Sequence, residues 1–244
     1  MINFIKYDLK SNKTYLITIL LIQLLGLLGA LMVRFFAPLH LIFADRRLTD
    51  ILFIVSIVFF LGINFTFMAN FIYKDYFTKR AMLTFSLPLS IKSFILAKII
   101  GLSCFYLASG IFLSLSLKLL AYNLGGDFIY YLAFGLVLIN VLALCLNLNM
   151  AKSRFKGEVR WMDMVINLLL VILPLVVYSS LNALVIINGS LERAGGMGLS
   201  FIFPFAIGSE GLYIILTPLI YYVLVGLIMY FVNVTYIDKN LDLS

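Results

Sequence analysis

Residues 51–73, ILFIVSIVFFLGINFTFMANFIY, run from Asp50 to Lys74 without a charged side chain. A helix needs about 20 apolar residues to cross the hydrocarbon layer of a bilayer. Inside lipid, a segment must satisfy its own backbone hydrogen bonds, and a helix does so within itself. The stretch therefore predicts a membrane-spanning helix.

Other uncharged stretches of similar length lie on both sides of this one. They lack the alternating polarity of barrel strands. We therefore predict an all-α integral membrane fold, a single transmembrane domain over residues 1–244. Its six transmembrane helices are expected at roughly 14–36, 51–73, 94–120, 128–150, 164–188 and 211–235.

The overall composition agrees with these spans. Hydrophobic residues make up 64% of the chain and charged residues only 12%, about half of what a soluble domain carries. A soluble core of this size could not bury so much apolar surface, whereas a bilayer accommodates it.

The basic residues predict the orientation. If the N-terminus is cytoplasmic and the loops alternate, most of the 18 basic residues fall inside, as the positive-inside rule requires. This accounts for the net charge without a nucleic-acid partner. We expect a multi-pass protein of the cell membrane, in contact with membrane lipid, with both termini cytoplasmic. The basic residues on the outer side would be Arg34, Arg46, Arg47, Lys118 and Arg193.

Three segments outside the spans stand out. In residues 1–13, Ile2, Ile5 and Leu9 recur at helical spacing, which favours an N-terminal interfacial helix over a plain charged flank. Residues 74–93, KDYFTKRAMLTFSLPLSIKS, are too polar to span and too apolar for a free linker; Ser90 there suits the N-cap of the next helix. Residues 194–209, AGGMGLSFIFPFAIGS, predict a re-entrant-like outer segment before the last helix.

The sequence offers no reactive constellation. His40 is the only histidine, so a paired zinc motif is excluded, and we expect no catalytic and no metal-binding residues. There is no GxxxxGK[ST] phosphate loop, so the chain is not expected to be an enzyme by itself. No predicted span carries an ionisable residue near its centre, which argues against ion-coupled transport.

Amide side chains within the predicted spans have two interpretations. They hydrogen-bond between helices, or they line a substrate path. For the path the candidates are Asn64, Asn70 and Asn182; the other amides in the spans are Gln23, Asn140, Asn147 and Asn167.

The stretch from Tyr73 to Lys98, YKDYFTKRAMLTFSLPLSIKSFILAK, resembles the ABC-2 type transporter permeases of Gram-positive bacteria. That family shows an acidic residue, a stretch with Thr or Ser, a Leu-Pro pair followed by Ser, and a Lys entering the third helix. The family often has a glycine where this chain has Thr78 and Lys79. The matching positions are Asp75, Thr84, Leu87, Pro88, Ser90 and Lys98.

The resemblance implies a function and partners. Such permeases work in pairs, so a second permease copy or a related permease is expected, and they dock on a separate ATP-binding cassette ATPase subunit. This chain would bind no cofactor, because ATP and Mg belong to the partner subunit. The residues implied in ATPase coupling are Lys74, Asp75, Phe77, Lys79, Arg80 and Pro88.

The predicted function is the permease subunit of an ATP-driven exporter. Its cargo would be hydrophobic or amphipathic, and relatives in this family export peptides such as phenol-soluble modulins or confer resistance to peptide antibiotics. Two alternatives stay open: an ion-coupled secondary transporter, and a non-transporting membrane immunity or scaffold protein.

Overall fold

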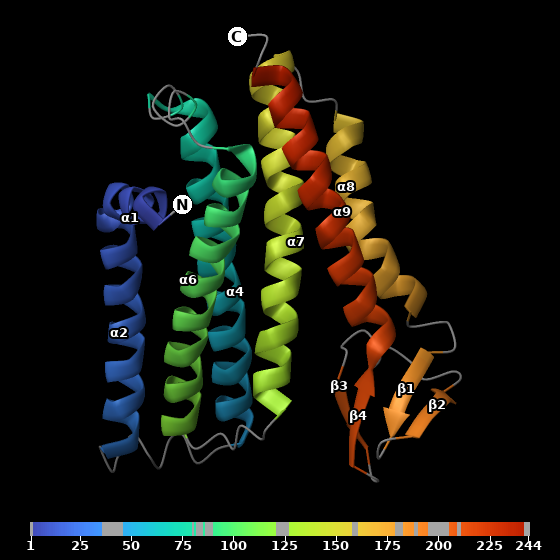
Figure 1. Cartoon of the computed structure of the whole chain (residues 1–244). Coiled ribbons are helices and arrows are strands. Elements are labelled where there is room, and N and C mark those ends of the chain that lie inside the picture. The colour runs from blue at the N-terminus through green and yellow to red at the C-terminus, as the bar shows by residue number, and fades with distance from the viewer. Residues whose placement is uncertain are drawn as a thin grey trace. The chain divides into compact units, whose positions relative to one another are not determined.

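The computed structural model shows a largely helical chain with one small sheet (Figure 1). Its helices are α1 (Ile2–Ser11), α2 (Lys13–Phe35), α4 (Arg46–Phe77), α6 (Ile91–Leu119), α7 (Asp127–Lys156), α8 (Trp161–Tyr178) and α9 (Leu216–Leu241). The structure describes residues 2–35, 46–79, 81, 85, 90–120, 127–157, 161–178, 183–187, 190–194, 205–208 and 211–241.

Within the described residues, five helices are long and apolar enough to cross a membrane. The qualifying stretches are Lys13–Met32, Phe53–Phe77, Ile91–Leu119, Tyr131–Lys156 and Pro218–Leu241. The chain is therefore a helical, multi-pass membrane protein, as predicted. The predicted fifth span, 164–188, is not among these stretches; in this region the structure describes the shorter apolar helix Trp161–Leu173.

The residues after α8 form strands that the all-α prediction did not contain. The strands are β1 (Ala183–Ile187), β2 (Ser190–Ala194), β3 (Phe205–Gly208) and β4 (Gly211–Ile215). They pair antiparallel in the order β2-β1-β4-β3. At the ends of the two outer pairs, Ile187 pairs with Ser190 and Gly208 pairs with Gly211.

These strands correct three predicted boundaries. The end of the fifth span is strand β1, and the start of the sixth span, at 211, is strand β4. The described part of the predicted re-entrant segment, Phe205–Gly208, is strand β3, while residues 195–204 and 209 lie outside the described residues. The fold is thus a helical membrane protein with a small antiparallel sheet.

The chain divides into two compact units by its internal contacts. Unit 1 comprises Met1–Phe71 and Leu96–Gly126, and unit 2 comprises Ile72–Ile95 and Asp127–Ser244. The division falls inside α4 and inside α6, so each of these helices contributes to both units.

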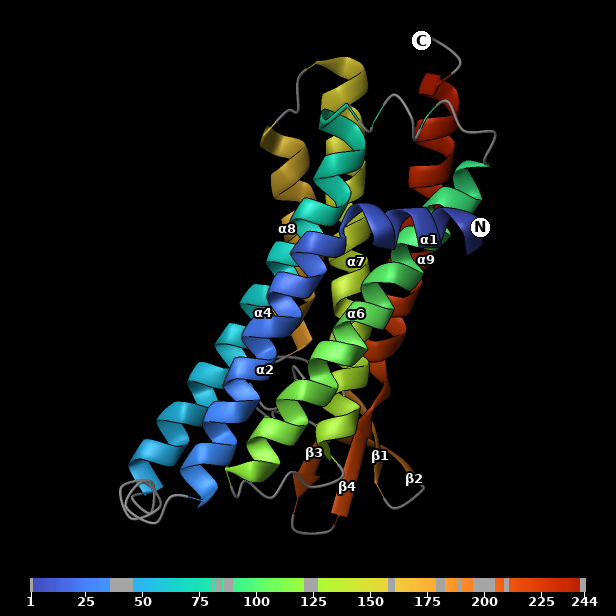
Figure 2. The same ribbon diagram turned by 90° about the vertical axis from the view of Figure 1, so that its left-hand side faces the viewer.

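In unit 1, aromatic rings hold α2, α4 and α6 together. Phe67 of α4 stacks on Phe105 of α6 with 3.8 Å between ring centroids, and on Tyr15 of α2 at 6.1 Å. Gly101 of α6 lies so close to Phe71 that an added Cβ would come within 3.1 Å of its ring. The N-terminal helix α1 lies across the end of α2 (Figures 1 and 2), and it starts as a helix at Ile2 as predicted.

In unit 2, α7 packs along α9, and α8 joins them. Val141 of α7 contacts Gly226 of α9, where an added Cβ would lie 3.4 Å from the valine methyl. The Tyr222 hydroxyl of α9 donates a 2.8 Å hydrogen bond to the carbonyl of Val171 in α8. Lys152 and Asp163 form a 3.2 Å ion pair between α7 and α8.

Gly157, with a φ of 74°, follows α7 in the conformation that favours glycine at a helix end.

Candidate functional site

A buried ion pair joins the N-terminal helix to a spanning helix in unit 1. The Lys98 ammonium of α6 lies 2.6 Å from Oδ2 of Asp8 in α1, and the two residues are 5% and 2% exposed. The amide of Asn12 donates to Oδ1 of Asp8 at 3.4 Å and to its backbone carbonyl at 3.0 Å. Both carboxylate oxygens are therefore engaged, as a buried carboxylate requires.

Lys98 also binds α4. Its ammonium donates to the carbonyl of Phe71 at 3.3 Å and lies 3.8 Å from the centre of the Phe71 ring, a cation–π distance. One side chain thus ties α1, α4 and α6 together. The resemblance pointed to Lys98 but gave it no partner, and Asp8 was missed. The sequence did hold a signal, because Asp8 follows Ile5 by three residues and so continues the apolar face of α1.

The residues implied in ATPase coupling lie in or after the last turn of α4. Asp75 is fully buried, Lys74 is partly buried, and Phe77 and Lys79 are exposed. Arg80 and Pro88 lie outside the described residues. The described members are therefore a buried carboxylate, a partly buried lysine and an exposed pair.

Next to Asp75, the buried Tyr76 begins a chain of hydrogen bonds across unit 2. Its hydroxyl donates to Oδ1 of Asn147 in α7 at 2.9 Å, and the Asn147 amide donates to Oδ1 of Asn233 in α9 at 2.8 Å. The Asn233 amide then donates to the carbonyls of Leu144 at 3.0 Å and Met229 at 2.8 Å. The sequence had suggested that such amides bind helices to one another, and Asn147 does so here.

The segment between α4 and α6 receives part of its cover from its own unit. The Phe85 ring lies 5.7 Å from Tyr76, 6.2 Å from Phe94 and 5.8 Å from Phe155. Ser90 caps α6 as predicted, since its hydroxyl accepts from the backbone N–H of Ser93 at 3.4 Å. Phe85 is thus covered by rings of its own unit.

The two substrate-path candidates that the structure describes, Asn64 and Asn70, make hydrogen bonds within unit 1. Asn64 is buried and donates to the carbonyl of Phe60 in its own helix at 2.8 Å. Asn70 donates to the Tyr15 hydroxyl of α2 at 3.3 Å. Asn182 lies outside the described residues. Both placed amides therefore serve hydrogen bonds within or between helices.

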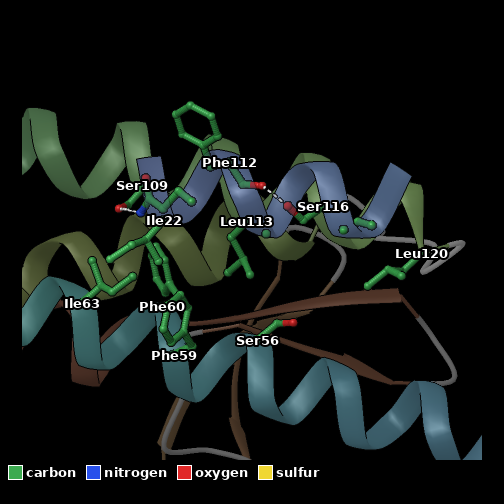
Figure 3. A pocket seen from close by; sticks show the side chains of 14 residues that line it. Ile22, Ser56, Phe59, Phe60, Ile63, Ser109, Phe112, Leu113, Ser116 and Leu120 are labelled. Carbon is green, nitrogen blue, oxygen red and sulfur yellow. Dashed lines mark hydrogen bonds between the residues drawn. The ribbon is translucent and has the colours of Figure 1, made fainter. Parts of the chain in front are cut away.

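A cavity of about 270 Å³ opens instead among α2, α4 and α6 of unit 1 (Figure 3). Small residues of α2 line one wall, and aromatic and aliphatic side chains line the others. Hydroxyls of Ser56, Ser109 and Ser116 and the amide of Gln23 are the polar groups of the lining. Of these, the sequence singled out only Gln23, as an amide within a span.

Comparison of the chain with models of protein families, with curated proteins and with solved structures found no match.

Proposed function

We propose that the chain is the transmembrane permease subunit of an ATP-driven exporter, working with a separate ATPase subunit and a second permease. The proposal rests on the resemblance of the stretch from Tyr73 to Lys98 and on the contacts of Lys98. Its cargo is hydrophobic or amphipathic, with peptides and peptide antibiotics as the first candidates by that resemblance.

The Asp8–Lys98 pair is the observation that carries the proposal. Helix α1 presents the exposed residues Lys6, Tyr7 and Lys10, which suit contact with lipid headgroups or a protein surface. The same helix is fixed to α4 and α6 through Lys98. A displacement of α1 by a partner would therefore move two apolar helices directly, as expected of a subunit whose energy comes from outside.

Copurification with an ATPase tests the proposal. We expect Lys79→Glu combined with Arg80→Glu to weaken the complex and to lower stimulated ATP hydrolysis, because Lys79 is exposed beyond the end of α4. The matched control is Lys118→Glu combined with Arg193→Glu, two basic positions expected on the opposite side. An unchanged complex and unchanged hydrolysis in the first variant would remove the coupling role of this segment.

One observation favours the ion-coupled alternative. Asp75 is fully buried near the end of the apolar stretch Phe53–Phe77, and buried ionisable groups of membrane proteins often serve ion pathways. Transport by proteoliposomes that hold a proton gradient and no ATPase, abolished by Asp75→Asn, would favour that function. Transport only in the presence of the ATPase would favour the exporter, and a chain that neither transports nor stimulates the ATPase would be a scaffold or immunity protein.

A further inference from the structure

A shallow groove runs along α9 towards the C-terminal end of that helix. Its volume is about 420 Å³, and its described lining consists of Phe231, Val232, Thr235, Tyr236, Lys239 and Asn240. The side chains of Phe231 and Val232 are 61% and 42% exposed, although both are large and apolar. On a helix long and apolar enough to cross a membrane, such side chains suit contact with acyl chains.

The groove changes from apolar to charged along the helix axis. Phe231, Thr235 and Lys239 follow one another at intervals of four residues, so they lie on one face of α9. Lys239 lies about 12 Å of helix rise beyond Phe231, and about 32 Å beyond Pro218, where the apolar stretch begins. That second rise matches a hydrocarbon layer of about 30 Å. Phe231 therefore belongs at acyl-chain depth and the Lys239 ammonium at headgroup depth.

A second lysine reaches the groove from α7. The Lys156 ammonium lies 5.9 Å from the centre of the Tyr236 ring, which lines the groove, and this is within cation–π range. The last turns of α7 and α9 and the first turn of α8 lie at the same end of unit 2 (Figure 1). Ammonium groups from two helices therefore flank the headgroup end of the groove.

The positive charge of these two lysines is not balanced within the described residues. Lys156 and Lys239 are exposed, and neither forms an ion pair with a residue that the structure describes. At the same end of unit 2, Asp163 is engaged by Lys152 at 3.2 Å. Asp238 points about 100° around α9 from Lys239 and is not among the described residues of the lining. The groove thus complements a phosphate, to which lysines bind as point charges.

We propose that this groove binds an anionic phospholipid. Its headgroup phosphate is held by the ammonium groups of Lys156 and Lys239, and an acyl chain lies along Phe231 and Val232. The sequence predicts that this end is cytoplasmic, where basic clusters beside spanning helices attract anionic lipid. A zwitterionic phospholipid has the same phosphate but adds a cation, which the two lysines repel. This binding does not rest on the exporter function.

Fluorescence quenching by phospholipids with brominated acyl chains tests the binding. The chain has one tryptophan, so Trp161→Phe combined with Phe231→Trp places the only tryptophan in the groove. Phosphatidylcholine nanodiscs then receive brominated phosphatidylglycerol or brominated phosphatidylcholine with the same acyl chains. We expect phosphatidylglycerol to bind about 25-fold more tightly, from about fivefold for each of the two lysines. If Phe231→Trp fails to fold, Val232→Trp serves the same purpose.

Lysine variants of this reporter show whether the two ammonium groups select the lipid. Lys156→Gln combined with Lys239→Gln should bring the affinities for the two lipids to within about twofold of each other. Lys13→Gln combined with Lys92→Gln is the matched control, because it removes the same charge from two other exposed lysines. This control should retain the preference for phosphatidylglycerol. A preference that survives the loss of Lys156 and Lys239 would refute their role.

A second reporter position distinguishes the groove from the rest of the surface. Leu169 of α8 is 47% exposed and is not among the described residues of the lining. With Trp161→Phe, the variant Leu169→Trp should report a preference of less than about threefold. An equally strong preference at both positions would mean that anionic lipid gathers around the whole protein, and the site would then be refuted.

The remaining outcomes identify other occupants. Quenching of the groove tryptophan by neither lipid would show that a protein surface, such as a second copy of the chain, covers the groove. We expect glycerol phosphate, added at constant ionic strength, to leave the preference unchanged. If it removes the preference, the lysines bind a soluble phosphate. Either of these results would overturn the assignment to a phospholipid.

Discussion

At the scale of the residue, we expect mutations of the buried Asp8–Lys98 pair to destabilise the protein. Removing one member of a buried ion pair leaves an uncompensated charge and costs about 3–5 kcal/mol. We therefore expect Lys98→Met to lower the thermal midpoint of the purified protein strongly. Lys92→Met is the matched control, because Lys92 is an exposed lysine six residues earlier on α6.

A double variant separates charge from packing. When Asp8→Leu is added to Lys98→Met, no charge is left buried, and apolar replacement of a buried pair is often neutral or stabilising. The double variant should therefore recover part of the lost midpoint. A double variant less stable than Lys98→Met would show that the pair contributes mainly through its hydrogen bonds with Asn12 and Phe71.

At the scale of the element, the Tyr76–Asn147–Asn233 chain links α4, α7 and α9. We expect Asn233→Leu to lower the free energy of unfolding by about 1–2 kcal/mol, because Asn147 loses a buried acceptor. Titration with a denaturing detergent measures the change. Thr235→Val on the same helix is the control, since the Thr235 hydroxyl bonds a carbonyl of its own helix and is exposed. Equal losses in the two variants would contradict a linking role.

Elements that depend on local sequence signals alone could be predicted from the sequence. Uncharged runs of sufficient length indicated the long apolar helices, and the spacing before Ile91 indicated the Ser90 cap. The sheet was missed because the hydropathy of residues 164–188 does not distinguish β-branched apolar residues, which favour strands, from apolar residues that favour helices. A signal was present, since Asn188-Gly189 separates Val185–Ile187 from Ser190 and Leu191, and this dipeptide is the strongest short hairpin signal.

The candidate site was less accessible to prediction. Asp75 and Lys98 could be located by their motif, but their burial depends on which helices approach them. The cavity arises because Gly26 and Gly29 of α2 face side chains of α4 and α6, and such a meeting cannot be deduced from local spacing. Gln23 could be recognised as an intramembrane amide, but not as one with an unmatched oxygen.

At the scale of the whole molecule, the number of crossings depends on α8. Its 18 residues give about 27 Å of rise, close to the thickness of a hydrocarbon layer. If α8 crosses, the residues before and after it lie on opposite sides. We expect an impermeant maleimide to label Ser190→Cys on intact cells, and Lys156→Cys only after permeabilisation. Both variants are made in a protein that also carries Cys104→Ala and Cys145→Ala, because these two free cysteines could react with the maleimide. Labelling of both from one side would reduce the spans to five.

The length of α4 has a consequence for the surrounding lipid. Its 32 residues rise about 48 Å, well beyond a hydrocarbon layer of about 30 Å, so the helix must tilt or carry its surplus into the headgroups. Acyl-chain length would then determine how far the turn with Asp75 and Tyr76 stands out of the hydrocarbon. Hydrophobic mismatch would thus make the environment of these two residues a property of the membrane as well as of the protein.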